Sequence, residues 1–191
     1  MDREMRIRPV ADADWDGIVT LEAGAYTPLG LCEGRAALVA KVRASPATCF
    51  VLDAGRRPAG YLLALPYPES AYPELADRDE SVLDSPNLHL HDLVVAEELR
   101  GRGLGRRLLG RLTADARARG YERISLVAVG GSHTFWSANG FTAHDGIADP
   151  RSYGAGSVYM SMPLPPWRTG RQDRLGAPPS APPTRDEVGP V

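Results

Sequence analysis

The chain has few lysines, few cysteines and no long apolar runs, and each shortage argues against a particular class of protein. Lys41 is the only lysine, so the Gly-Lys pair that the phosphate loop of nucleotide hydrolases requires is absent. Cys32 and Cys49 are the only cysteines and lack metal-ligand spacing, so we expect two reduced thiols. No apolar run reaches the roughly 18 residues of a membrane-spanning helix.

Composition favours one soluble domain. The 191 residues are 43% hydrophobic, which is enough for one substantial core, and the net charge of -2 gives no general attraction to nucleic acid or membrane. The charged start, Met1 to Arg6, does not resemble a secretory signal, so we expect a cytoplasmic protein. From Pro163 onwards proline, glycine and arginine dominate. We therefore predict a folded domain over 1–162 and a disordered tail over 163–191.

Hydrophobic periodicity predicts an α+β fold. The element order predicts a mixed central sheet of six to seven strands flanked by about four helices. The predicted strands cover 5–10, 48–53, 58–65, 88–95 and 123–129, with a closing pair around Phe141 and 158–162. The predicted helices begin near Asp12 or Asp14, run through Ala37 to Ser45, cover 103–119, and follow Ser132 as far as Gly140.

The segment from Leu93 to Gly105 reads as a buried strand, a glycine-rich loop and the start of a helix. Glycines at alternate positions let backbone N–H groups converge, and the helix start adds free donors and a positive dipole end. Arginines crowd this helix start, where cations are unfavourable unless an anion binds. They are Arg100, Arg102, Arg106 and Arg107. The segment therefore predicts a phosphate or pyrophosphate site.

Two short patterns carry a family resemblance. A dinucleotide fingerprint does not fit, because Arg106 stands where its third glycine belongs. Arg100-x-x-Gly103-x-Gly105, preceded by Leu93-Val94-Val95, instead resembles the acetyl-CoA loop of the GNAT family of N-acetyltransferases. The segment from Phe135-Trp136 to Gly140-Phe141 resembles the second signature of that family. The resemblance covers nearly all of 5–162 and implies the GNAT acyl-CoA N-acyltransferase fold, in which the mixed central sheet is mostly antiparallel.

The resemblance implies acetyl-CoA as the acyl donor and no metal. By analogy, the backbone of the strand before the loop holds the pantetheine arm, the loop amides hold the pyrophosphate, and aromatic residues after Val129 pack around the pantetheine. The expected cofactor-binding residues are Leu93, Val94, Val95, Arg100, Gly101, Arg102, Gly103, Leu104, Gly105, Arg106, Ser132, Phe135 and Trp136.

Acetyl transfer to an amine needs a base, and histidine has a suitable pKa. Strand alternation predicts His89 and His91 on one face and Asp92 on the other, near the expected thioester. Either histidine could be the base or an ordinary packed residue, and Asp92 could be a base or a substrate anchor. Trp136 replaces the tyrosine that serves as general acid in many relatives. Tyr153 and Tyr159 are the alternative acids, or ordinary sheet aromatics.

The leading hypothesis is direct acetyl transfer to a primary amine of a small molecule. The alternatives are a protein or peptide N-acetyltransferase, and a noncatalytic acyl-CoA-binding regulatory module. The connection over 67–86 carries six carboxylates and one arginine, so the acceptor could be cationic, although a solvated acidic loop is the simpler interpretation. No nucleic-acid or membrane partner is expected, and the chain could be a monomer or a homodimer.

Overall fold

The computed structural model describes residues 5–55 and 57–165, which form a seven-stranded sheet with helices on both faces. Neighbouring strands are antiparallel except β4 and β5, which are parallel. In spatial order the strands are β1 (Arg6–Pro9), β2 (Phe50–Asp53), β3 (Pro58–Pro66), β4 (Asn87–Val95), β5 (Arg123–Ala128), β7 (Val158–Pro163) and β6 (Thr142–His144). The predicted fold class is confirmed.

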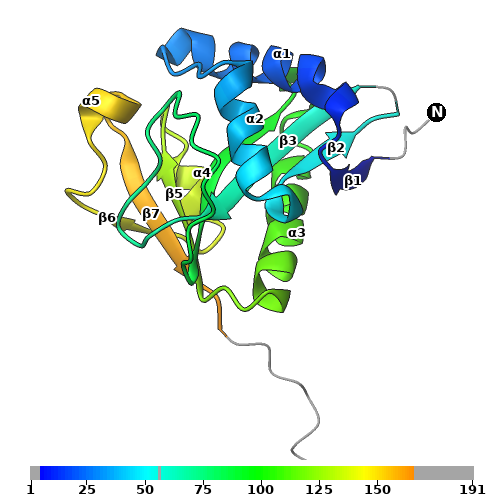
Figure 1. The fold of residues 1–191 in the computed structure, drawn as a ribbon. Coiled ribbons are helices and arrows are strands. Elements are labelled where there is room, and N and C mark those ends of the chain that lie inside the picture. Colours follow the sequence, from blue (N-terminus) through cyan, green and yellow to red (C-terminus); the bar gives the residue numbers. More distant parts are fainter. Residues whose placement is uncertain (1–4, 56, 166–191) are drawn as a thin grey trace, which may run out of the picture.

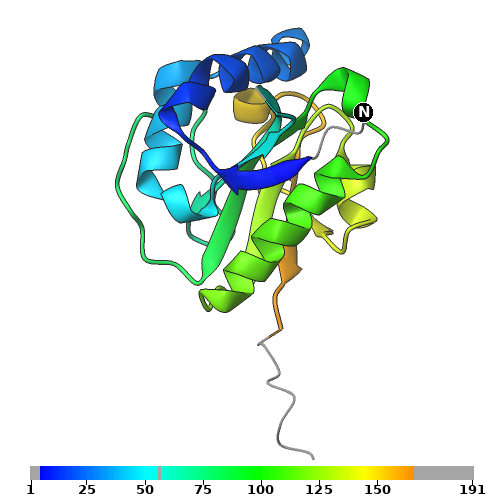
Figure 2. The same cartoon turned by 90° about the vertical axis from the view of Figure 1, so that its right-hand side faces the viewer.

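The helices divide between the two faces of the sheet, as Figures 1 and 2 show. The two N-terminal helices lie on one face and the long α3 lies on the other. The helices are α1 (Trp15–Tyr26), α2 (Arg35–Ala44), α3 (Leu104–Ala118), α4 (His133–Ser137) and α5 (Pro150–Tyr153). The short α5, in the connection between the closing strands, was not predicted. Among the described residues, no helix has the length and apolar character needed to cross a membrane.

Each face of the sheet has its own hydrophobic core. In β3, Leu62 and Ala64 pack in the core covered by α3, whereas Tyr61 and Leu63 pack in the core covered by α1 and α2. This alternation is the period of two that a strand imposes on its side chains. Burying a leucine fully contributes about 1.5–3 kcal/mol, so both cores hold their helices firmly on the sheet.

Strand β4 departs from regular geometry at two points. The pairing with β3 joins Leu63 to Asp92 and Ala64 to Leu90, so His91 is an extra residue in a β-bulge. On its other side, β4 pairs with β5 only through residues 87–89 of β4. The two strands therefore separate after His89, and β4 has no β5 partner over the rest of its length.

The fold extends beyond the predicted boundary at 162. Strand β7 includes Pro163, and Leu164 is buried in the core with its N–H donating to the Glu122 carbonyl at 2.7 Å. The greater part of the predicted tail, 166–191, lies outside the described residues.

Candidate active site

A cavity of about 620 Å³ occupies the place where β4 and β5 separate. Its walls come from both strands, from the loop before α3, from α4 and from the end of α1. The predicted cofactor-binding residues line it, with the exception of Arg102. Tyr26, Leu29 and His91 also line it, so one cavity joins the glycine-rich loop to a potential base.

The glycine-rich loop leaves room for an anion. Gly101 and Gly103 both have a φ of +76°, and a Cβ added to either would meet nothing within 4 Å. Gly105 is more confined, because a Cβ there would lie 3.4 Å from Phe135 and 3.5 Å from Leu93. Gly103 precedes the first turn of the 15-residue α3, whose leading amides have no partner within the helix. The loop thus presents free N–H groups and a positive dipole end.

Aromatic packing closes the cavity beside α4. Trp136 is buried, its ring packs edge-on against Phe135 and Phe141, and its indole N–H donates to Ser132 Oγ at 3.3 Å. An indole cannot supply a proton as a phenol does. The position of Trp136 therefore supports a packing role and leaves the general acid unassigned.

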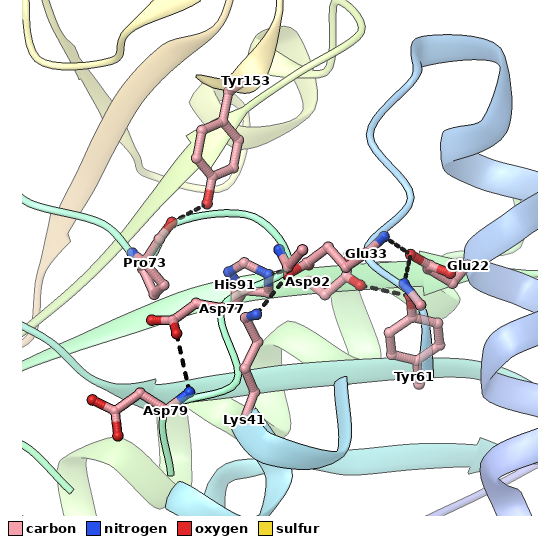
Figure 3. Close-up of polar contacts among 12 residues, drawn as sticks. Glu22, Glu33, Lys41, Tyr61, Pro73, Asp77, Asp79, His91, Asp92 and Tyr153 are labelled. Atoms are coloured by element: carbon pink, nitrogen blue, oxygen red, sulfur yellow. Dashed lines mark hydrogen bonds and ion pairs between the residues drawn. The ribbon is translucent and has the colours of Figure 1, made fainter. Parts of the chain in front are cut away.

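His91 is held by a buried carboxylate from outside its strand (Figure 3). Its Nε2 lies 2.5 Å from Oε1 of Glu33, which belongs to the link between α1 and α2. The other oxygen of Glu33 accepts from Lys41 Nζ at 2.6 Å and from the Ala76 N–H at 3.0 Å. The side chains of His91, Glu33 and Lys41 are all at most 5% exposed. These residues form the Glu33 network.

Charge determines which nitrogen of His91 carries the proton. Burial alone would raise the pKa of the Glu33 carboxyl, but His91 and Lys41 outweigh it and hold that pKa at about 2. The ionised carboxylate only accepts hydrogen bonds, so His91 Nε2 must be the donor. In the neutral ring, Nδ1 is then the acceptor, and this buried atom has no hydrogen-bond partner among the described residues.

Asp92 lies on the same face as His91, contrary to the prediction from strand alternation. The bulge at His91 shifts the alternation by one residue, so both side chains reach the layer of α1 and α2. The Asp92 carboxylate accepts from the hydroxyls of Tyr26 and Tyr61, the latter at 2.6 Å. Burial raises the pKa of Asp92 to about 6 despite the opposing effects of His91 and the two phenols. Asp92 is not among the residues that line the cavity.

His89 is fully buried and does not line the cavity. Its Nδ1 lies 3.1 Å from Ser125 Oγ, which also accepts from the Asn87 side chain. Burial, with His91 and Lys41, moves the pKa of His89 well below its usual range. This placement favours a neutral structural histidine over a base.

The two tyrosines predicted as alternative acids also lie away from the cavity lining. The Tyr153 hydroxyl donates to the Pro73 carbonyl at 2.6 Å, and burial raises its pKa. The Tyr159 hydroxyl accepts from the Ser70 N–H at 3.0 Å. Both hydroxyls fix the connection over 67–86, and their positions do not support a role in protonating the thiolate.

Sequence reasoning missed most of the Glu33 network. Glu33 and His91 are 58 positions apart. Glu22, also buried, accepts from the Glu33 N–H at 2.5 Å and so fixes the link from α1. Tyr26 is the tyrosine that lines the cavity. The available signal was the single lysine: Lys41 lies on the apolar face of its predicted helix, and a buried lysine requires an anionic partner.

The acidic connection over 67–86 uses part of its charge internally. Glu69 pairs with Arg123 at 2.9 Å, and Glu80 pairs with Arg43 at 3.0 Å. Its backbone also completes the Glu33 network through Ala76. Among the described residues, no three His, Cys, Asp or Glu side chains are grouped as a metal site.

The cavity lies beside a glycine-rich loop in a mixed α+β fold, and comparison with known proteins identifies the family of this chain. The sequence matches the model of the Acetyltransferase (GNAT) family over residues 15–141. The chain therefore belongs to this family of acyl-CoA-dependent N-acetyltransferases.

Individual relatives are more distant. N-alpha-acetyltransferase 80 of Mus musculus is 56% identical over 46 residues, which are 24% of this chain and 15% of that protein. The structure is similar to Ard1 from Thermoplasma volcanium, with a TM-score of 0.65, 16% identity and coverage of 84% of this chain and 97% of that one. It is also similar to the GphF GNAT-like decarboxylase in complex with isobutyryl-CoA, with a TM-score of 0.69, 23% identity and coverage of 84% and 100%. These two structures establish the fold.

Proposed function

We propose that the protein transfers the acetyl group of acetyl-CoA to a primary amine by direct attack within a ternary complex. One observation carries this proposal. The glycine-rich loop, the start of α3 and His91 line a single cavity, and the Nδ1 atom of His91 is buried with no hydrogen-bond partner among the described residues. The donor and the base can therefore meet in one site.

The donor end of the cavity, formed by the glycine-rich loop and the start of α3, could hold the pyrophosphate and the pantetheine arm of acetyl-CoA. Amides at the start of α3, together with Arg100 and Arg106 in the lining, would bind its pyrophosphate. The stretch of β4 without a β5 partner would offer backbone groups to the amides of the pantetheine arm. Leu93, Phe135 and Trp136 would supply apolar contacts.

An ammonium acceptor loses two protons in this reaction: the first goes to solvent and leaves the neutral amine, and the second leaves the nitrogen as the amide forms. The amine nitrogen attacks the thioester carbonyl, the C–N bond forms, and the C–S bond breaks to release the CoA thiolate. His91 Nδ1 takes the proton of the amine, directly or through water, and the thiolate receives a proton from solvent. Positioning of the two reactants supplies much of the rate enhancement, and a base typically adds about 10²–10⁴-fold.

The acceptor class has two candidates. A small primary amine, cationic in solution, is suited to a cavity that Tyr26, Leu29 and His91 line together and to the six carboxylates of the nearby connection over 67–86. The N-terminus of a protein is the second candidate, favoured by the 46-residue similarity to an N-alpha-acetyltransferase.

The first experiment is acetyl-CoA-dependent release of CoA thiol against separate pools of small amines, polyamines, amino acids, aminoglycosides and short peptides. We expect release that depends on an acceptor pool, and division of that pool identifies the class. A no-acceptor control corrects for hydrolysis. Tight binding of acetyl-CoA without release in any pool would contradict the enzyme proposal and favour a noncatalytic acyl-CoA-binding module.

A further inference from the structure

The two oxygens of the Glu33 carboxylate accept different numbers of hydrogen bonds. Oε2 accepts from two donors, Lys41 Nζ and the Ala76 N–H, whereas within residues 5–55 and 57–165 Oε1 contacts only the His91 ring. The Lys41 side chain is 3% exposed, so water cannot readily replace its anionic partner. The Glu33 backbone is fixed in turn by buried Glu22. The orientation of Glu33 is therefore fixed by four separate segments of the chain: α1, α2, the connection over 67–86 and β4.

We propose that Glu33 is a positioning residue that holds His91 in the Nε2–H tautomer and so leaves Nδ1 as the proton acceptor. The catalytic meaning of this assignment rests on the proposed function. The assignment itself rests on geometry: a carboxylate oxygen 2.5 Å from Nε2, and a buried Nδ1 on a residue that lines the cavity. Lys41 has a second role here, because it shares the carboxylate and limits how strongly Glu33 stabilises the imidazolium.

Several charged or titratable groups surround His91, and each must be considered in a pH experiment. Glu33 faces it from the link after α1, and Lys41 stands behind Glu33 on α2. The others are Tyr26 on α1, His89 and Asp92 on the same strand, and Glu22 behind the link. Of these, only Glu33 makes a direct hydrogen bond to the ring in the described residues.

Glu33→Gln tests the tautomer directly. The buried Lys41 ammonium and the Ala76 N–H both require an acceptor, so the Gln carbonyl should turn to them and its NH₂ group to His91. A donor facing Nε2 favours the Nδ1–H tautomer, which removes the free lone pair from the proposed reaction. Imidazole ¹⁵N resonances distinguish the two nitrogens. We expect Nε2–H in the unsubstituted protein and Nδ1–H in Glu33→Gln, with Glu122→Gln, an exposed carboxylate, as the matched control.

Glu33→Gln and Lys41→Met should move the titration of His91 in opposite directions. Loss of the carboxylate destabilises the imidazolium, so the midpoint shifts down. Loss of the lysine leaves His91 as the remaining cation beside Glu33, although the Ala76 N–H still donates to Oε2, so the midpoint shifts up. In the acid limb of kcat the same opposite shifts are expected, and Glu33→Gln should also lower kcat by about 100-fold with little change in the KM for acetyl-CoA.

The outcomes separate this assignment from the proposed function. An Nδ1–H tautomer in the unsubstituted protein, or equal titrations in the two variants, would overturn the role of Glu33 whatever the activity. The expected tautomer and opposite shifts, found in a protein without acetyl transfer, would support the role of Glu33 and count against the proposed function. A variant that does not fold leaves the tautomer of the unsubstituted protein as the deciding measurement.

Discussion

The two ends of the cavity are built in opposite ways. The donor end is an exposed loop of glycines and arginines contributed by one continuous segment, and a Cβ at Gly101 or Gly103 would meet only open space. The Glu33 network is buried and is assembled from the link after α1, from α2, from the bulge in β4 and from the connection over 67–86. The proposed donor site would bind through backbone groups, whereas the Glu33 network consists of buried side chains that depend on one another for hydrogen bonds.

This difference predicts two kinds of sensitivity. At the donor end, added bulk or negative charge should weaken acetyl-CoA binding, because it would fill the open space of the loop and cancel its positive potential. In the Glu33 network, a substitution that removes one polar group should reduce proton transfer or the stability of the fold, because each buried polar group depends on its partner. Substitutions at each end test whether the two functions are separable.

The largest effect is expected from Gly103→Glu. The substitution places a side chain at a φ of +76° and a carboxylate where the pyrophosphate would bind. We expect acetyl-CoA binding to weaken by about 100-fold or more, or about 2.7 kcal/mol, measured by calorimetry. Gly110→Glu, in the middle of the same helix with open space around it, is the control. Normal binding in Gly103→Glu would contradict the donor site.

His91→Ala should reduce turnover while it spares the donor end. Loss of a general base lowers kcat by about 10²–10³-fold, and the dissociation constant for acetyl-CoA should stay within about twofold. The acid limb of the kcat profile should disappear with the imidazole. His144→Ala on β6, away from the cavity lining, is the control. An unchanged pH profile of kcat in His91→Ala would contradict the role of His91 as general base but would not affect the proposed donor site.

Asp92→Asn should change the dependence of stability on pH. The native pKa of Asp92, about 6, is raised from its ordinary 3.8, so the folded protein retains a proton that the unfolded chain releases. The stabilisation that this bound proton gives the folded state is fully present below about pH 4 and is lost as the pH rises through about 6. Asparagine cannot ionise. The free energy of unfolding of the variant should therefore improve relative to the unsubstituted protein by about 2–3 kcal/mol between pH 4 and 7.

Urea unfolding at several pH values measures this difference, and Asp12→Asn at an exposed position is the control. Other carboxylates titrate in the same way in both proteins, so the difference isolates Asp92. A constant offset across the pH range would contradict a raised pKa.

The smallest effect is expected from the acidic connection. Glu74 is exposed, and Glu74→Gln should raise the KM of a cationic acceptor about twofold at low salt, with the increase lost in high salt. Glu122→Gln, on an exposed residue before β5, is the control. Equal KM values and equal salt dependence in the two variants would leave the connection as a structural element that supports Ala76 and Glu33.

The sequence predicts what local patterns encode. The seven strands, the long α3 and the cofactor loop follow from periodicity and glycine spacing over short windows. Even α5 had a local signal, because Asp149 caps it and Pro150 occupies its first position. The cofactor residues carried by the family resemblance lie together around one cavity, apart from Arg102.

The Glu33 network could not be predicted in this way. One extra residue in β4 places Asp92 with His91, and alternation cannot foresee a bulge. The partner of His91 is 58 positions away and was unremarkable among 24 acidic residues. Pairing across the fold, rather than residue type, gives Glu33 its role.

The separation of β4 from β5 also affects which residues of the site can be substituted in the course of evolution. Where the two strands part, β4 would offer peptide groups to the acyl donor, and these groups are the same for any residue except proline. Side chains there can therefore be exchanged for others of similar size without loss of that recognition. The Glu33 network has no such freedom. If these roles hold, sequence changes should accumulate faster along the strands proposed to receive the donor than among the few buried groups of the Glu33 network.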